Sequence, residues 1–138
     1  MSCTACDGSE TLHVTRGESR TFLLTVTNLK TKVPVDVTGA KVWFTIKNRV
    51  EDVDAIVAKK NLIAGGVDGQ ILITVPQTGL TAGQVQVFID PADTAGLDPE
   101  ETYWCDAWVQ LTNNRRYQVV SNRPFKVDPA VTSGADFF

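Results

Sequence analysis

Strict alternation of apolar and polar residues runs along most of this chain, and it predicts β-strands that bury one face. The alternation is clearest in residues 21–27, 41–47, 70–75, 84–89 and 103–111. Shorter or weaker runs are residues 11–15, 55–61, 117–120 and 125–127. The apolar positions of the runs form the predicted core, which consists of Phe22, Leu24, Val26, Val42, Phe44, Ile46, Ile71, Ile73, Val85, Val87, Ile89, Val109 and Leu111.

Turn-forming residues separate the predicted strands. Glycine-rich residues 65–69 break the chain, and Asn113-Asn114 predicts a hairpin turn because asparagine tolerates positive φ. Seven to nine short strands at a spacing of roughly ten residues predict an all-β fold, either a sandwich or a barrel. No long amphipathic helix is visible, which argues against a sheet with helical crossovers.

One short helical turn is predicted over residues 90–96. Asp90 suits the N-cap, and Pro91 suits the first helical position, whose N–H has no partner in a helix. Asp93 then lies in the first turn, where negative charge is favourable. Gly96 is expected to end the turn in a left-handed conformation.

Composition restricts the function classes. A chain of 138 residues with 43% hydrophobic and 21% charged residues fits a single globular domain. Its net charge of −3 provides no general basic field, so we expect no nucleic-acid partner. No apolar run approaches the roughly 20 residues that span a bilayer, so we expect no membrane association. The first residues lack the pattern of a signal peptide, and we expect synthesis and folding in a cytoplasm.

Few residues are available for catalysis or metal binding. A zinc site built from Cys3, Cys6, His13 and Cys105 has the required number of ligands. Cys105, however, falls in the apolar register of its strand, as a small buried hydrophobe would. A lone histidine without a nucleophile motif argues against a catalytic triad. We therefore expect no enzyme activity, no cofactor, no metal and no small-molecule substrate.

The three tryptophans all fall in the polar register of their strands. Trp43 alternates with Lys41 and Thr45, and Trp104 and Trp108 flank Asp106. Large rings that point away from a core are typical of interfaces, although they can also bind sugars or be covered by the chain itself. Trp43 joins the other two rings only if its strand lies in the same sheet. The predicted contact residues are Trp43, Trp104, Trp108, Phe137 and Phe138.

Several segments resemble the small immunoglobulin-like virion proteins of tailed bacteriophages, including the N-terminal domain of upper baseplate proteins. The matching segments are TRGE (residues 15–18), FLLTV (22–26), VDVTGAKVWFTIK (35–47), IDPADTAGL (89–97), YWCDAWVQL (103–111) and FKVDPAVT (125–132). The resemblance covers roughly residues 11–132, and none of its segments is a catalytic motif. It implies an antiparallel immunoglobulin-like β-sandwich of seven to nine strands with one short helical turn.

The resemblance also implies a role as a structural part of a virion. We expect residues 11–129 to form the sandwich, and residues 1–10 and 130–138 to form arms that contact neighbouring subunits. The expected partners are other virion proteins and further copies of the chain, in a tail, a baseplate, a neck or a head decoration. The alternative from a different class is a carbohydrate-binding module for host attachment, which would use the same tryptophans.

Overall fold

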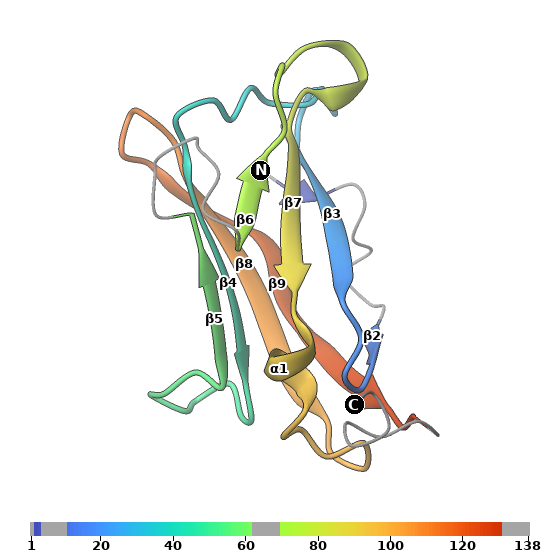
Figure 1. Ribbon diagram of the computed structural model, residues 1–138. Coiled ribbons are helices and arrows are strands. Elements are labelled where there is room, and N and C mark those ends of the chain that lie inside the picture. Colours follow the sequence, from blue (N-terminus) through green and yellow to red (C-terminus); the bar gives the residue numbers. More distant parts are fainter. Residues whose placement is uncertain (1, 4–10, 62–69, 131–138) are drawn as a thin grey trace.

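Two β-sheets pack face to face in the computed structural model, which describes residues 2–3, 11–61 and 70–130, the first pair by its backbone alone (Figure 1). The strands are β1 (Ser2–Cys3), β2 (Leu12–Thr15), β3 (Arg20–Thr27), β4 (Lys41–Lys47), β5 (Val57–Lys60), β6 (Ile71–Ile73), β7 (Gln84–Ile89), β8 (Tyr103–Gln110) and β9 (Arg116–Asp128). One sheet has the order β1-β3-β7-β6, and the other has the order β2-β9-β8-β4-β5. The fold is therefore all-β and is an immunoglobulin-like β-sandwich, as predicted.

The core lies between the two sheets and is formed by the apolar register of each strand. Of the predicted core residues, all but Phe22 and Leu111 are buried. Those two side chains lie partly buried against the core. The Phe22 ring lies at the margin, with its centroid 6.4 Å from those of both Phe44 and Phe125. A shift of any strand by one residue would turn its buried set toward water.

Three details of the strands differ from the sequence prediction. β2 pairs with β9 in parallel, so the sandwich is not wholly antiparallel. The two short runs expected at residues 117–120 and 125–127 are one strand, β9, because irregular pairing opposite Ala107 lets it continue along β8. The backbone of Ser2–Cys3, assigned to an arm from the sequence, pairs with β3.

The predicted helical turn forms α1 (Pro91–Thr94), and Asp90 occupies its N-cap position. The carboxylate of Asp93 accepts a hydrogen bond from the backbone N–H of Asp90 at 2.7 Å. Gly96 does not adopt the expected left-handed conformation, because Ala95 caps the turn in right-handed helical geometry. A second short element is a 3₁₀ turn over Gly79–Thr81. No helix among the described residues has the length and apolarity needed to cross a membrane.

Lys59 makes the connection between α1 and the five-stranded sheet. Its side chain is only 5% exposed, and its Nζ lies 2.7 Å from Asp93 Oδ2 and 3.4 Å from Asp90 Oδ2. A buried ammonium group requires such partners, because desolvation without them costs several kcal/mol, a rough figure. The aspartates predicted as capping residues therefore also neutralise a lysine that the sequence pattern did not single out.

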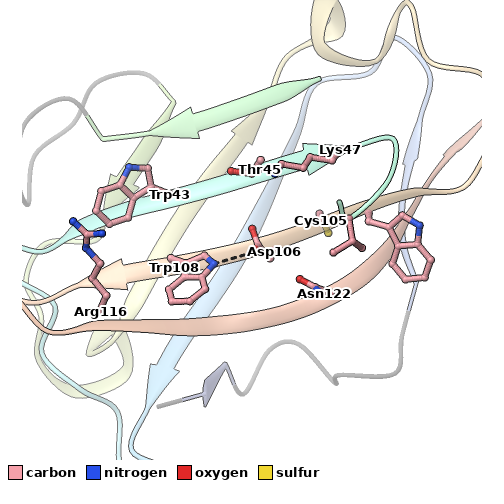
Figure 2. A pocket seen from close by; sticks show the side chains of 10 residues that line it. Trp43, Thr45, Lys47, Cys105, Asp106, Trp108, Arg116 and Asn122 are labelled. Carbon is pink, nitrogen blue, oxygen red and sulfur yellow. Dashed lines mark hydrogen bonds between the residues drawn. The ribbon is translucent and has the colours of Figure 1, made fainter. Parts of the chain in front are cut away.

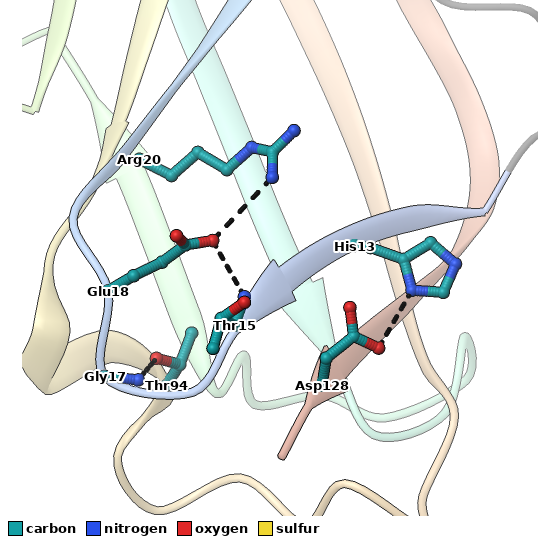
Figure 3. Close-up of polar contacts among 7 residues, drawn as sticks. All are labelled: His13, Thr15, Gly17, Glu18, Arg20, Thr94 and Asp128. Carbon is teal, nitrogen blue, oxygen red and sulfur yellow. Dashed lines mark hydrogen bonds and ion pairs between the residues drawn. The ribbon is translucent and has the colours of Figure 1, made fainter. Parts of the chain in front are cut away.

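The loop between β2 and β3 is fixed by polar contacts with the two strands that it joins and with α1 (Figure 3). The Glu18 carboxylate accepts a hydrogen bond from the Thr15 N–H at 2.8 Å and lies 3.7 Å from Arg20. The N–H of Gly17, which has φ +82°, donates to the Thr94 hydroxyl at 2.9 Å. These contacts tie the loop to α1 at one end of the sandwich.

Candidate functional site

The three tryptophans share the solvent side of the five-stranded sheet, and we call this surface the tryptophan face. β4 and β8 are neighbouring antiparallel strands, so Trp43 lies directly opposite Trp108. Trp104 lies opposite Lys47, one side-chain row beyond Asp106. The open question of whether Trp43 joins the other two is thereby answered, because all three rings belong to one surface of two adjacent strands.

Each ring of the tryptophan face keeps contact with solvent. Trp108 is 38% exposed, while Trp43 and Trp104 are half-buried. The rings line an open hollow of about 550 Å³ over β4, β8 and β9, shown in Figure 2. The remaining lining residues are Thr45, Lys47, Val50, Cys105, Asp106, Arg116 and Asn122.

Asp106 holds Trp108 in place. Its Oδ2 accepts a hydrogen bond from the Trp108 indole N–H at 2.8 Å and another from the Gln118 amide at 3.2 Å (Figure 2 draws the first). The Gln118 amide lies within 3.4 Å of Asn122 Oδ1 as well. A ring fixed in this way loses less side-chain freedom when a partner covers it, so the arrangement favours binding.

Positive charge borders the hollow at opposite ends. The Arg116 guanidinium lies 5.9 Å from the centroid of the Trp43 ring, within the range of a cation–π interaction, and its Nε donates to Gln110 Oε1 at 3.0 Å. Lys47 lies at the other end, beside Trp104. Arg116 was not among the contact residues predicted from the sequence. The hairpin register, which places Arg116 opposite Gln110, is the signal that could have added Arg116 to the site.

Cys105 is a core residue, as its register predicted, although it is also one of the residues that line the hollow. Burial raises the pKa of the Cys105 thiol from 9.0 to about 12. The positive charge of Arg123 lowers this pKa and the negative charge of Asp106 raises it, but burial has the largest effect. The thiol is therefore protonated at neutral pH and is a poor nucleophile and metal ligand.

Arg123 faces the same side of β9 as the core and lies opposite Cys105. It is 2% exposed, and its Nε finds no hydrogen-bond partner within the described part of the chain. Arg123 comes three residues after Val120, and nothing in the local sequence pattern predicted that its side chain would be buried.

The four residues of the hypothetical zinc site are not brought together where the structure describes them. His13 lies on β2 and contacts Asp128, with 3.2 Å between Nδ1 and Oδ1, whereas Cys105 is in the core (Figure 3). No group of three potential ligands from His, Cys, Asp or Glu is found within residues 11–61 and 70–130. Cys6 and the side chain of Cys3 lie outside the described residues, as do Phe137 and Phe138 of the predicted contact set.

Comparison with known proteins adds information on the fold alone. No model of a known protein family matches the chain, and no curated protein matches it. Among solved structures, one of murine CRIg is similar in fold, with 14% sequence identity and a TM-score of 0.40. That alignment covers 88% of this chain and 92% of the murine chain. At this level of similarity the comparison carries no information on ligands or partners.

Proposed function

We propose that this chain is a structural, non-enzymatic component of a tailed-phage virion that acts through protein–protein contacts on its tryptophan face. The observation that carries the proposal is the exposure of Trp108 beside two half-buried tryptophans and Arg116. Tryptophan and arginine are the residues most enriched at the energetic centres of protein interfaces. The resemblance of residues 11–132 to small virion proteins supplies the class of partner.

The exposed area of Trp108 determines how much binding free energy a partner gains by covering the ring. A fully exposed tryptophan presents about 250 Å², so an exposed fraction of 38% leaves roughly 95 Å² that a partner can cover. At about 25 cal/mol per Å², this burial contributes about 2.4 kcal/mol. That value reaches the threshold of about 2 kcal/mol for an interface hot spot.

Adding purified protein back to particles that lack it tests the proposal. Trp108→Ala should weaken binding to such particles by tens of fold, following the estimate of about 2.4 kcal/mol. Leu23→Ala is a matched control, because Leu23 is also an exposed apolar residue but lies on the other sheet, on β3. Equal binding of wild type and Trp108→Ala would contradict the proposal.

A carbohydrate-binding module is the second candidate. Asp106 and Asn122 lie beside the tryptophan rings in the hollow, with Gln118 hydrogen-bonded to both, and such polar groups can bind the hydroxyls of a sugar that stacks on an indole. Binding of the isolated protein to a glycan array, lost in Trp108→Ala and kept in Leu23→Ala, would favour this function over the structural one.

A further inference from the structure

Three loops in the described part of the chain lie together at one end of the sandwich, and we call this end the basic end. The loops are residues 28–40, 74–83 and 111–115. The N–H of Val37 donates to the Gln77 side chain at 3.1 Å, which ties the first loop to the second. Lys41 pairs with Gln110, which places the hairpin between β8 and β9 at the same end. Figure 1 shows these loops together at the top of the molecule.

Basic residues dominate the charge of this end. Its charged residues, counting the adjoining strand positions, are Lys30, Lys32, Asp36, Lys41, Arg115 and Arg116. Five of these six are basic, and no salt bridge within the described part of the chain involves any of them. The loop of residues 74–83 carries no charge at all. The described residues of this end therefore carry a net positive charge, although the whole chain has a net charge of −3.

The opposite end carries the opposite charge, and we call it the acidic end. Residues 48–56 follow β4 and residues 95–102 precede β8, and the pairing of Lys47 with Trp104 brings these two loops together. β4 separates the two ends by about 20 Å, because its seven residues span six steps of about 3.3 Å. The two loops carry six acidic residues, Glu51, Asp52, Asp54, Asp98, Glu100 and Glu101, against Arg49 and the adjoining Lys47, and none of these eight forms a salt bridge within the described part of the chain.

Exposed aliphatic side chains concentrate at both ends. Nine large hydrophobic residues of the described chain are exposed, and all but Leu23 and Trp108 lie on the end loops. The basic end carries Leu29, Val33, Val75 and Leu80, and the acidic end carries Val50, Val53 and Ile56. Leu80 is fully exposed, and Val53 is 93% exposed. Apolar side chains at a centre with charges around it are typical of protein interfaces.

We propose that the basic end of one copy of this chain binds the acidic end of the next copy, so that copies associate head to tail. Opposite charge on the two ends specifies this orientation, because a contact between like ends would bring like charges together. The two surfaces of such a contact differ, so the association is heterologous and continues into a ring or a filament. The contact uses none of the three tryptophans, although Arg116 and Val50 also line the hollow beside them, and it does not depend on a virion role.

Charge reversal at each end separately tests the contact. Lys30→Glu/Arg115→Glu cancels the net positive charge of the basic end, and Glu51→Lys/Glu100→Lys cancels the net negative charge of the acidic end. Each variant alone should self-associate at least about tenfold more weakly than wild type in sedimentation experiments, because the attraction between oppositely charged ends is then lost. Wild-type association should also weaken between about 0.05 M and about 0.5 M salt, since the Debye length falls several-fold.

Mixing the two variants distinguishes loss of the contact from misfolding of the variants. The intact acidic end of the first variant should bind the intact basic end of the second, whereas misfolded variants would not bind each other. Leu23→Glu/Ser121→Glu is the control, because it adds negative charge at exposed positions in the middle of strands β3 and β9, away from both ends. It should leave self-association unchanged.

Two outcomes would overturn the head-to-tail contact. One is a wild-type chain that stays monomeric at low salt up to millimolar concentration. The other is self-association that withstands both charge reversals but is lost in Trp108→Ala, which would assign the contact between copies to the tryptophan face. If the head-to-tail contact is refuted, the proposed binding of the tryptophan face to particles is unaffected, so the two proposals can be refuted separately.

Discussion

Replacing Asp93 by asparagine tests whether the buried Lys59 fixes α1 to the five-stranded sheet. Asparagine keeps the shape of the side chain and can still accept the hydrogen bond from the Asp90 N–H, but it removes the charge 2.7 Å from the lysine. Because Lys59 is 5% exposed, its ammonium group cannot turn to water instead. The variant therefore isolates the cost of an uncompensated buried charge.

The structure sets the expected magnitude. Removing one partner of a buried ion pair costs about 3–5 kcal/mol. Asp90 remains 3.4 Å from Lys59, and Asp93 is itself 20% exposed, so we expect a loss of about 2–3 kcal/mol in the free energy of unfolding. With a urea m-value of about 1–3 kcal/mol per M, the unfolding midpoint should fall by roughly 1–2 M.

Lys59→Met provides the control for this experiment. Methionine fills a similar volume without charge, and the Asp93 left behind can reach solvent, so the loss should stay below about 1 kcal/mol. The double variant Lys59→Met/Asp93→Asn should then be close to Lys59→Met in urea unfolding. The reasoning is refuted if Asp93→Asn costs less than about 0.5 kcal/mol, or if Lys59→Met costs more than Asp93→Asn.

The remaining predictions concern the core, the buried thiol and one close backbone contact. Phe44→Ala should cost about 3–5 kcal/mol in urea unfolding through the cavity it leaves, and a loss below about 1 kcal/mol would contradict the packing. Because the pKa of Cys105 rises from 9.0 to about 12 on folding, its protonated form stabilises the fold, and this stability is lost as pH rises above about 9. The stability of wild type relative to Cys105→Ala should therefore fall by up to about 1.4 kcal/mol per pH unit above pH 9, whereas a constant difference would contradict the shift. Gly83→Ala places a Cβ 2.5 Å from the Val26 carbonyl oxygen, so it should destabilise by at least about 1 kcal/mol more than Gly79→Ala, which also has positive φ but meets open space; equal losses would contradict the close contact.

Alternation alone predicted the strands and most of the core, because a period of two defines which face of a strand is buried. Thr11 to Thr15 gave a weak pattern, and β2 pairs in parallel through only four residues, a choice that depends on the distant β9. The continuity of β9 was also beyond the local pattern, because Arg123 places a charge in the buried register. Tertiary context decides both features.

The tryptophan face was predicted in part. Register placed the three rings away from the core, but the pairing of β4 with β8, which brings Trp43 opposite Trp108, depends on contacts distant in sequence. The hairpin register could have placed Arg116 beside Trp108, but its contact with the Trp43 ring depends on the same pairing of β4 with β8. The burial of Lys59 could not be predicted, since nothing in its own strand pattern distinguishes it from the exposed Lys60. Its partners come from the helical turn that follows β7.

Oxidative footprinting of intact virions tests most directly whether the tryptophan face is the contact that builds this chain into a particle. Hydroxyl radicals label exposed indoles, and mass spectrometry reads the labelling of Trp108 in the free monomer and in purified particles. We predict that the chain is present in a fixed copy number per particle, and that Trp108 is labelled in the monomer but protected in the particle, while Leu23 changes less. Absence of the chain from purified particles, or equal labelling of Trp108 in both states, would contradict the central claim.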